Sequence, residues 1–410
     1  MKLRPHQLQK STELVQILQQ FKIAYLFGEV RSNKTGTALQ TAKLLNCNDV
    51  LVVTKKKAIP SIKADYEAFS FTYNLTCINY ESVHKVERNN FDLVIYDEAH
   101  CLGAYPKPSK TTKLCKKMFS NIPCLLMTGT PHAESVSQLY HQFYVSKYSP
   151  FANYVNFYKW AKDFVNIEQK RIGSHTINDY SNAKEVEVFN KLKKIWLVMT
   201  QQDAGFDVNI NEHILSVEPP KLIKELTTRF IKDKAIQGES GAILGDTPAK
   251  FQSKLHQLFN GTCIIEDWEG NTKPIVLSHY KANFIRDYFA KKKIAIIYYY
   301  QAELEVLKKV FPHNLTTDVD EFNETYYNIA VQNYTTEGMN LSKADALVYY
   351  NLGFSGKNFI QSRDRMTVKG RQNNNVYFVC EKEGMTFNIL KRVRDKMDYN
   401  FKEFKKDYGI

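Results

Sequence analysis

The feature that most constrains the fold is a repeated alternation of short apolar runs with helix-like stretches. Residues 23–27 (IAYLF) lead into a glycine-containing loop, and residues 35–45 then have the pattern of a helix. Further short apolar runs, each bounded by turn residues or charges, follow at 49–54, 75–80, 91–98 and 122–130. Buried parallel strands joined by crossover helices produce this pattern, so we predict a doubly wound sheet here.

The second half of the chain repeats the alternation. Strand-like runs occur at 273–279, 293–300, 326–334, 345–352 and 374–381, with helix-like stretches at 281–292 and 301–311 between them. Because 410 residues exceed what one core usually organises, we predict an α/β fold with two tandem doubly wound parallel-sheet domains. A double proline within 201–221 marks the boundary, and we predict domains 1–212 and 213–410.

The segment at about 148–200 differs from the rest of the first domain. Residues 151–165 and 183–199 are amphipathic with helical spacing. We therefore predict a helical insertion or extension of the first domain here. Any ligand is expected at the carboxyl ends of the parallel strands.

The charge of the chain suggests a polyanionic partner. Its 56 Lys and Arg residues outnumber its 43 Asp and Glu residues, which gives a net charge of +13. Nucleic acid would fit such a basic protein. A lysine-rich solvated surface would produce the same count.

Cysteine usage and hydropathy point to a soluble protein. The seven cysteines are scattered without a CxxC pair, which favours free thiols in a reducing compartment and argues against a zinc site. The first ten residues are polar and basic, and no apolar run approaches the length of a membrane span. We expect a cytoplasmic monomer that does not associate with membranes.

Residues 28–35 have the spacing of a phosphate-binding loop. Gly28 is followed after four residues by Asn33, Lys34 and Thr35, where a complete motif would have glycine at position 33. Asparagine is one of the few other residues that tolerate a positive φ, so Asn33 can preserve the turn. Lys34 would reach the β- and γ-phosphates, and Thr35 would hold Mg²⁺. A surface turn that happens to contain a lysine is the alternative.

Two adjacent acids follow the apolar run at 91–98. In a nucleotide hydrolase, Asp97 would bind Mg²⁺ and Glu98 would polarise the attacking water. Solvated acids at a strand end are the alternative, although their position downstream of a phosphate loop favours a catalytic pair.

From these residues the sequence resembles superfamily-two DEAD/DEAH-box helicases and translocases. "DEAH" (97–100) resembles their Walker B box, "LRPHQ" (3–7) their Q motif and "TGTP" (128–131) their motif III. "VLVVTKKKA" (50–58) and "INYES" (78–82) resemble motifs Ia and Ib. The forms of the motifs look most like the Swi/Snf-type branch, and the small size looks like compact phage-encoded members.

The resemblance also extends to the second half. "TTEGMNLSKAD" (335–345) resembles motif V, and "QSRDRMTVKGR" (361–371) resembles motif VI. In this family both domains are RecA-like and the cofactors are ATP and Mg²⁺. The nucleic-acid partner of the Swi/Snf-type branch would be DNA rather than RNA.

The resemblance implies a role for each matching residue. The nucleotide-binding set comprises Gln7, which would read the adenine, and Gly28, Ser32, Asn33, Lys34, Thr35 and Gly338. The set that couples hydrolysis to movement comprises His100, Thr128, Gly129 and Thr130, and the set that contacts nucleic acid comprises Thr54, Lys55, Lys56 and Thr336. Gln361 and Arg365 would complete catalysis with Lys34 and Glu98, and Glu337 would act beside Gly338.

Motif VI departs from the family because Val368 occupies the position of its second arginine. Arg365 could act alone as the arginine finger, or Lys369, Arg371 or Arg363 could replace the missing residue. The favoured function is an ATP-dependent helicase or translocase that nucleic acid stimulates. The alternative is a nucleic-acid-binding or partner-regulating protein whose ATPase is inactive or depends on a partner.

Overall fold

The computed structural model describes residues 2–29, 32–132, 135–172, 175–205, 209–335, 339–368, 371–395, 404 and 407–408. The chain divides into two compact units, Met1–Phe206 and Asp207–Ile410. The division falls a few residues before the boundary we placed at 212/213. Strand β9 (Asn209–Val217) explains the difference, because it pairs in parallel with β18 (Asn373–Glu381) of the second unit.

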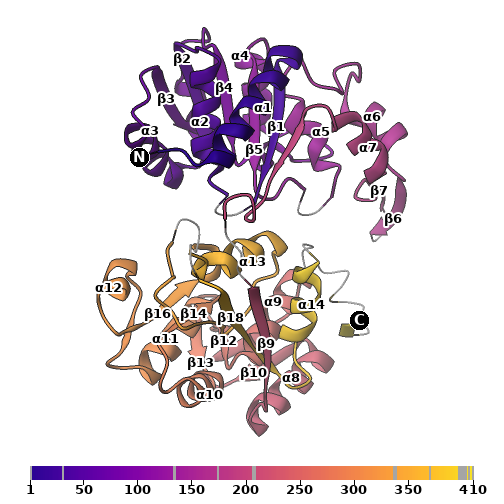
Figure 1. The fold of residues 1–410 in the computed structure, drawn as a ribbon. Coiled ribbons are helices and arrows are strands. Elements are labelled where there is room, and N and C mark those ends of the chain that lie inside the picture. Colours follow the sequence, from indigo (N-terminus) through magenta and orange to yellow (C-terminus); the bar gives the residue numbers. More distant parts are fainter. Residues whose placement is uncertain are drawn as a thin grey trace. The chain divides into compact units, whose positions relative to one another are not determined.

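The first unit is built on a six-stranded parallel sheet in the order β3-β2-β4-β5-β1-β8 (Figure 1). Its strands are β1 (Ile23–Gly28), β2 (Asp49–Thr54), β3 (Asn74–Asn79), β4 (Leu93–Asp97), β5 (Cys124–Thr128) and β8 (Trp196–Met199). The first five agree with the predicted runs. In β1, β2, β4 and β5 nearly all consecutive residues are buried because helices cover both faces of the sheet, whereas most residues of the edge strands β3 and β8 are only partly buried.

Two apolar cores lie on the two faces of this sheet, because successive strand residues point to opposite sides. Helices α1 (Pro5–Phe21), α2 (Lys34–Leu44) and α3 (Ile59–Ala68) contribute to one core. Helices α4 (Lys110–Phe119) and α5 (Gln138–Phe143) contribute to the other. The doubly wound arrangement predicted from the alternation of apolar runs is therefore confirmed.

The segment at 148–200 contains the two expected helices but also β-structure. Helices α6 (Phe157–Phe164) and α7 (Glu185–Leu192) are shorter than the predicted stretches, and the hairpin β6 (Glu168–Ile172) and β7 (His175–Asp179) separates them. The predicted continuation of the second helix to residue 199 is wrong, because Trp196 begins β8 at the sheet edge. Its ring stacks on that of Tyr25 at 4.3 Å, a tertiary contact that helical periodicity does not reveal.

The second unit contains its own six-stranded parallel sheet, in the order β15-β16-β14-β17-β18-β9. The remaining strands of this sheet are β14 (Ile294–Tyr298), β15 (Leu315–Thr316), β16 (Asn328–Gln332) and β17 (Ala346–Tyr349). Its helices are α10 (Tyr280–Tyr288), α11 (Gln301–Val310), α12 (Val319–Glu324), α13 (Gly356–Arg363) and α14 (Thr386–Arg394). The predicted α/β fold with two parallel-sheet domains is therefore confirmed.

A separate four-stranded antiparallel sheet precedes β14 in this unit. Its order is β10-β11-β12-β13, and its strands are β10 (Ala235–Gly238), β11 (Gly241–Leu244), β12 (Thr262–Glu266) and β13 (Thr272–Val276). Helices α8 (Lys221–Asp233) and α9 (Pro248–Phe259) accompany it. The run at 273–279, which we read as part of the second doubly wound domain, instead forms the edge strand β13.

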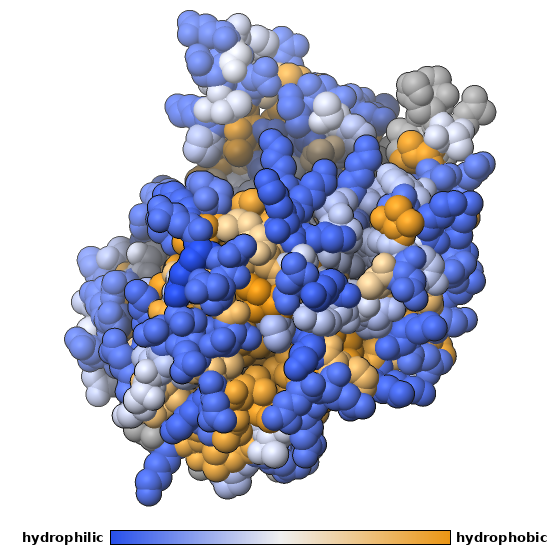
Figure 2. Space-filling model, turned by 90° about the horizontal axis from the view of Figure 1, so that it is seen from above, coloured by the Kyte–Doolittle hydropathy of each residue, from blue (hydrophilic) through white to orange (hydrophobic). Residues whose placement is uncertain are grey.

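Hydrophilic residues cover most of the face in Figure 2, and hydrophobic residues reach the surface between them. None of the helices that the structure describes combines the length and the apolar character needed to cross a bilayer.

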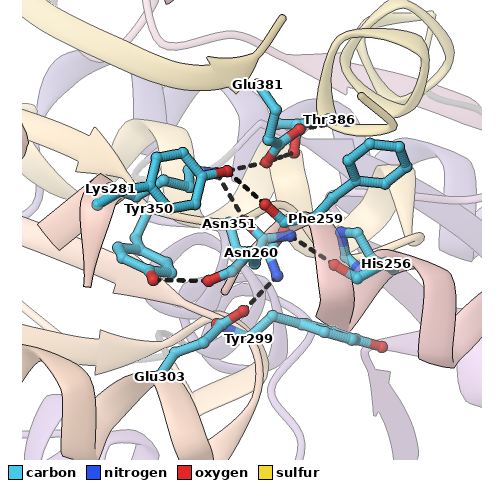
Figure 3. Close-up of polar contacts among 11 residues, drawn as sticks. His256, Phe259, Asn260, Lys281, Tyr299, Glu303, Tyr350, Asn351, Glu381 and Thr386 are labelled. Carbon is cyan, nitrogen blue, oxygen red and sulfur yellow. Dashed lines mark hydrogen bonds and ion pairs between the residues drawn. The ribbon is translucent and has the colours of Figure 1, made fainter. Parts of the chain in front are cut away.

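A buried polar cluster lies where several elements of the second unit meet (Figure 3). Lys281 of α10 has a fully buried side chain, and its Nζ lies 2.6 Å from Glu381 Oε1 at the end of β18. The same ammonium donates to Asn260 Oδ1 at 2.6 Å. Thr386 donates its hydroxyl to Glu381 at 2.8 Å, and Tyr350 donates its hydroxyl to the Asn260 carbonyl at 2.9 Å. The cluster thus joins β18 to helices that pack against the sheet.

Glu303 forms the other part of this cluster. It is fully buried near the start of α11, and its Oε2 accepts hydrogen bonds from the backbone N–H groups of Tyr299 (2.8 Å) and Tyr300 (3.0 Å). Its Oε1 accepts from Asn351 Nδ2 at 2.6 Å. Burial nevertheless dominates and raises the pKa of Glu303 from 4.5 to about 7.

We expect Glu303 to make the stability of the chain depend on pH. Because its folded pKa is raised, the folded state holds a proton that the unfolded state releases, and stability falls as pH rises from about 4.5 to about 7. Glu303→Gln should flatten this fall in the unfolding free energy, measured by chemical denaturation across pH 5–8. Glu305→Gln on the exposed face of the same helix is the control and should keep the wild-type slope. Equal slopes for all three proteins would contradict the prediction.

Candidate nucleotide-binding site

The loop between β1 and α2 has the shape that its sequence predicts. Asn33 precedes the first residue of α2 and adopts φ 63° and ψ 42°, so the positive φ expected at this position is confirmed. Gly28 ends β1, and a Cβ there would lie 3.0 Å from both Lys34 Cβ and Ser32 Oγ. The chain therefore turns tightly enough to require a glycine at 28 and a residue that tolerates left-handed geometry at 33.

Substitutions at Asn33 should follow this backbone geometry. Asn33→Gly is expected to keep nucleotide binding and to stabilise the loop by up to about 1 kcal/mol, because glycine adopts a positive φ without strain. Asn33→Val should weaken binding, because a β-branched residue at positive φ is strained. Nucleotide affinity by fluorescence titration and the thermal midpoint check both variants. If valine and glycine behaved alike, the loop geometry would not control binding.

Ser32 is an unusual residue of this loop. Its side chain is fully buried, yet its hydroxyl has no hydrogen-bond partner within the described part of the chain. A buried polar atom without a partner is costly and calls for an explanation such as a bound ligand. The orphaned hydroxyl therefore fits a loop that contacts an anion.

Gln7 lies in the first turn of α1 with its side chain fully buried. Its Oε1 accepts a hydrogen bond from the Arg4 N–H at 2.9 Å, and its Nε2 lies 3.5 Å from the carbonyl oxygen of Asn33. A Cβ on Gly36 would approach this Nε2 to 2.8 Å. The glutamine thus packs against the loop and α2, and adenine reading by Gln7 stays a prediction.

Asp97 ends β4, the strand that lies two places from β1 in the sheet, and Glu98 follows it directly. Both side chains are buried, and Glu98 has a left-handed φ of 52°. The Lys34 Nζ lies 4.0 Å from Glu98 Oε1. The structure therefore brings the predicted lysine and the predicted acids together at the carboxyl edge of the sheet, where parallel α/β proteins bind ligands.

The surroundings of the two carboxylates shift their pKa values in opposite directions. Burial, assisted by the negative charge of Glu98, raises the pKa of Asp97 to about 6. Burial also opposes ionisation of Glu98, but the charge of Lys34 and the contact with His100 outweigh it and hold the pKa of Glu98 below its usual range. Lys55 adds to the lowering, so its charge acts on the acid pair. Glu98 is therefore the carboxylate that stays ionised.

A chain of side-chain contacts joins Glu98 to the end of β5. The Thr128 hydroxyl donates to Glu98 Oε2 at 2.9 Å, and His100 Nδ1 lies 2.8 Å from Thr128 Oγ1. The N–H of Thr130 donates to Thr128 Oγ1 at 3.2 Å. A Cβ on Gly129 would lie 3.2 Å from the carbonyl oxygen of Gly28. The four residues predicted to couple sites thus lie between the acid pair and the phosphate loop.

The structure contradicts the prediction made for Thr54. We expected it to contact nucleic acid, but its side chain is fully buried and its hydroxyl donates to Asp97 Oδ2 at 2.6 Å. A buried hydroxyl with its donor used internally cannot reach a phosphate backbone. Lys56, two residues further, is exposed at the start of a short 3₁₀ helix.

Sequence reasoning missed the contribution of Tyr80 to this site. Tyr80 follows β3 and donates its hydroxyl to the main-chain carbonyl of Asp97 at 2.7 Å. The signal available was its position directly after a strand that neighbours the strand of Thr54. Its burial, which shows that the hydroxyl points inward, came only from the fold.

Several predicted residues lie in the second unit. Gln361 belongs to α13 and Arg365 to the 3₁₀ helix at Asp364–Met366, and both side chains are largely buried. Arg363 lies 3.0 Å from Glu212 of β9. Gly338, Thr336, Glu337 and Lys369 lie outside the described residues.

Arg371 has a local structural role. Its guanidinium donates to the carbonyl oxygens of Ser342 (2.9 Å), Ala344 (3.0 Å) and Asn373 (3.0 Å). An arginine whose donors hold three main-chain carbonyls is poorly placed to act as a substitute finger. This argues against the role that we considered for Arg371, because rotating it toward a phosphate would leave those carbonyls unpaired.

Comparison with known proteins shows what the first unit is similar to. Residues 12–206 match the family model of the SNF2-related domain. None of the curated proteins compared with the chain matches it. Among solved structures, the SWI2/SNF2 ATPase core of Sulfolobus solfataricus in complex with double-stranded DNA gives a TM-score of 0.43 at 14% identity, covering 96% of this chain and 91% of that chain.

The SWI2/SNF2 ATPase core domain from the same organism gives a TM-score of 0.43 at 12% identity, covering 97% of this chain and 89% of that chain. The family match extends over nearly all of the first unit, including the phosphate loop and the acid pair. The first unit is therefore similar to SNF2-related domains, in agreement with the resemblance of its motifs to the Swi/Snf-type branch.

Proposed function

We propose that this protein is a helicase or translocase that hydrolyses ATP when nucleic acid is bound and moves along DNA. The observation that carries the proposal is the placement of the Lys34 Nζ 4.0 Å from Glu98 Oε1, after a loop in which Asn33 has left-handed backbone geometry. A lysine, a buried carboxylate pair and a helix N-terminus at one sheet edge are the parts that phosphoryl transfer needs.

Each residue of the first unit has a distinct task in this proposal. The N–H groups at the start of α2 and the Lys34 ammonium bind the phosphates of ATP. Ionised Glu98 orients the attacking water and accepts its proton. Thr128 holds Glu98 in place through its hydrogen bond at 2.9 Å, and His100 lies 2.8 Å from the Thr128 hydroxyl and 3.1 Å from Glu98 Oε2.

The residues present fit a Mg²⁺ ion, which would neutralise charge on the phosphates when bound. Thr35 and Asp97 offer a hydroxyl and a carboxylate, and Mg²⁺ prefers such hard oxygen ligands. Among the described residues there is no group of three or more His, Cys, Asp or Glu side chains able to hold a metal. Mg²⁺ is usually bound through one or two carboxylates and substrate phosphates, and Asp97 would supply such a carboxylate.

The second unit is proposed to supply the positive charge that stabilises the phosphates during hydrolysis. Arg365 and Gln361 of motif VI, with Glu337 and Gly338 of motif V, would act on the phosphates as the family resemblance implies. Of the arginines considered for the finger, Arg363 is paired with Glu212 and Arg371 holds main-chain carbonyls. We assign the finger to Arg365 because it occupies the position of the first arginine of motif VI.

DNA is the proposed nucleic acid, on the basis of the net charge of +13 and the Swi/Snf-type family. Lys56, exposed in the short 3₁₀ helix that follows β2, is proposed to contact its phosphates. The charged backbone would supply most of the affinity, so binding should weaken steeply with added salt.

An ATPase assay tests this function. Turnover should be low without nucleic acid and should rise with double-stranded DNA more than with single-stranded DNA or RNA. Glu98→Gln should bind ATP but fail to hydrolyse it, because the amide cannot accept the water proton. Strand displacement on the best activator then separates unwinding from translocation.

The same assay distinguishes the alternative of an inactive or partner-dependent ATPase. Zero turnover on every nucleic acid, with DNA binding intact, would reject the motor function in the isolated chain. Turnover that appears only when a partner protein is added would assign the chain to a partner-dependent motor.

A further inference from the structure

Two hydroxyl groups from neighbouring strand ends converge on Asp97. The Thr54 hydroxyl donates to Asp97 Oδ2 at 2.6 Å, and the Tyr80 hydroxyl donates to the Asp97 carbonyl oxygen at 2.7 Å. The sheet register brings them there, because Val53 of β2 lies opposite Tyr96 of β4 and Thr54 lies opposite Asn79 of β3. Asp97 is thus held by hydrogen bonds from the ends of two different strands.

Each donor is followed by a short segment that carries exposed basic side chains. Thr54 is followed by the exposed Lys56 and Lys57, and Tyr80 is followed by the exposed His84 and Lys85. Basic side chains in these two segments can bind phosphates, whereas the hydroxyl of the donor residue before each segment points inward to Asp97. The two segments therefore connect the basic surface to the acid pair within two to five residues.

Burial gives these hydrogen bonds their energetic weight. Thr54 is 0% and Tyr80 is 6% exposed, so losing a partner would leave a polar group without water to replace it. The Thr54 hydroxyl donates to a carboxylate, and such a bond to a charged group is stronger than one between neutral groups, such as the bond from Tyr80 to the main-chain carbonyl. Valine has nearly the shape of threonine and phenylalanine nearly that of tyrosine, so each bond can be removed with little change in packing.

We propose that Thr54 and Tyr80 are positioning residues for Asp97. They orient Asp97 toward its metal ion, and they couple nucleic-acid binding at the two basic segments to the position of Asp97. This inference rests on the proposed ATPase function. Thr54 orients the carboxylate itself, and Tyr80 orients the main chain that carries it. Side chains that orient a metal ligand typically change metal affinity or activity by about 10–100-fold when removed.

The test compares Thr54→Val with the conservative Thr54→Ser, which keeps the hydroxyl. Binding of a fluorescent non-hydrolysable ATP analogue is measured across a Mg²⁺ titration, so that the readout does not depend on turnover. Thr54→Val should raise the Mg²⁺ concentration at half-maximal binding by about tenfold, and Thr54→Ser should restore it. DNA affinity should stay within about twofold of wild type, because the buried hydroxyl does not touch DNA.

Tyr80→Phe removes the other hydrogen bond to Asp97, and it remains informative should Thr54→Val fail to fold. It should reduce the ratio of DNA-stimulated to basal turnover severalfold, with DNA affinity unchanged. Wild-type Mg²⁺ dependence in Thr54→Val or wild-type stimulation in Tyr80→Phe would overturn the proposal. A loss of DNA affinity in Thr54→Val without a change in Mg²⁺ dependence would also overturn it. Absence of Mg²⁺-dependent nucleotide binding in the wild-type protein would instead reject the proposed function.

Discussion

Lys34→Ala is expected to reduce ATP turnover by about 100-fold or more, in the presence and absence of DNA. Removing one preorganised donor from a site that stabilises developing charge typically costs this much. In this protein the same change also leaves the buried Glu98 without the cation whose Nζ lies 4.0 Å away. Loss of that charge should raise the pKa of Glu98 and weaken its ability to orient water. Steady-state phosphate release measures the effect.

Lys43→Ala is the matched control for this variant. Lys43 lies in the last turn of the same helix α2 and is exposed. Its replacement should leave turnover within about twofold of wild type, because surface substitutions away from a site have small effects. If Lys34→Ala turned over ATP like the control, the assignment of residues 28–35 as the nucleotide-binding loop would be wrong.

Lys281→Met is expected to cost about 3–5 kcal/mol of unfolding free energy, the largest stability effect that we predict. Lys281 and Glu381 are both 0% exposed and lie 2.6 Å apart, so the variant leaves a buried carboxylate without its counter-charge. It also removes the donor to Asn260 Oδ1, another fully buried group (Figure 3). Chemical denaturation of the full chain, followed by circular dichroism, measures the loss.

Two comparisons establish the cause of that loss. Lys308→Met breaks the exposed pair with Glu305 in the same unit and should leave the denaturation curve nearly unchanged, because exposed ion pairs contribute little. Lys281→Met combined with Glu381→Met should recover part of the loss, because no charge then remains buried and unpaired. A single variant as stable as the Lys308→Met control would mean that water reaches Glu381.

The strands were predictable because their signal is local. The runs at 23–27 and 49–54 are continuous and apolar, which follows from being covered on both faces. The turn at Asn33 was also predictable, because the tolerance of asparagine for positive φ is a property of the residue itself. Both predictions depend only on neighbours in the sequence.

Other features were not predictable because they depend on distant partners. Residues 196–199 continue an amphipathic pattern, but contact with β1 turns them into a strand. The antiparallel sheet β10-β11-β12-β13 has short strands with weak periodicity, and no expectation covered its first three strands. The sequence allows a catalytic role for Arg371, because it does not reveal the three main-chain carbonyls that the guanidinium binds.

The sequence by itself determined the two α/β domains, the loop at 28–35, the acid pair at 97–98 and the family resemblance. These follow from residue types at fixed spacings along the chain. Only the tertiary structure decided that the Thr54 hydroxyl is turned inward to Asp97 and that Lys281 pairs with Glu381, one hundred positions away. The direction of a side chain is set by what packs around it, and that packing brings together residues that the sequence separates.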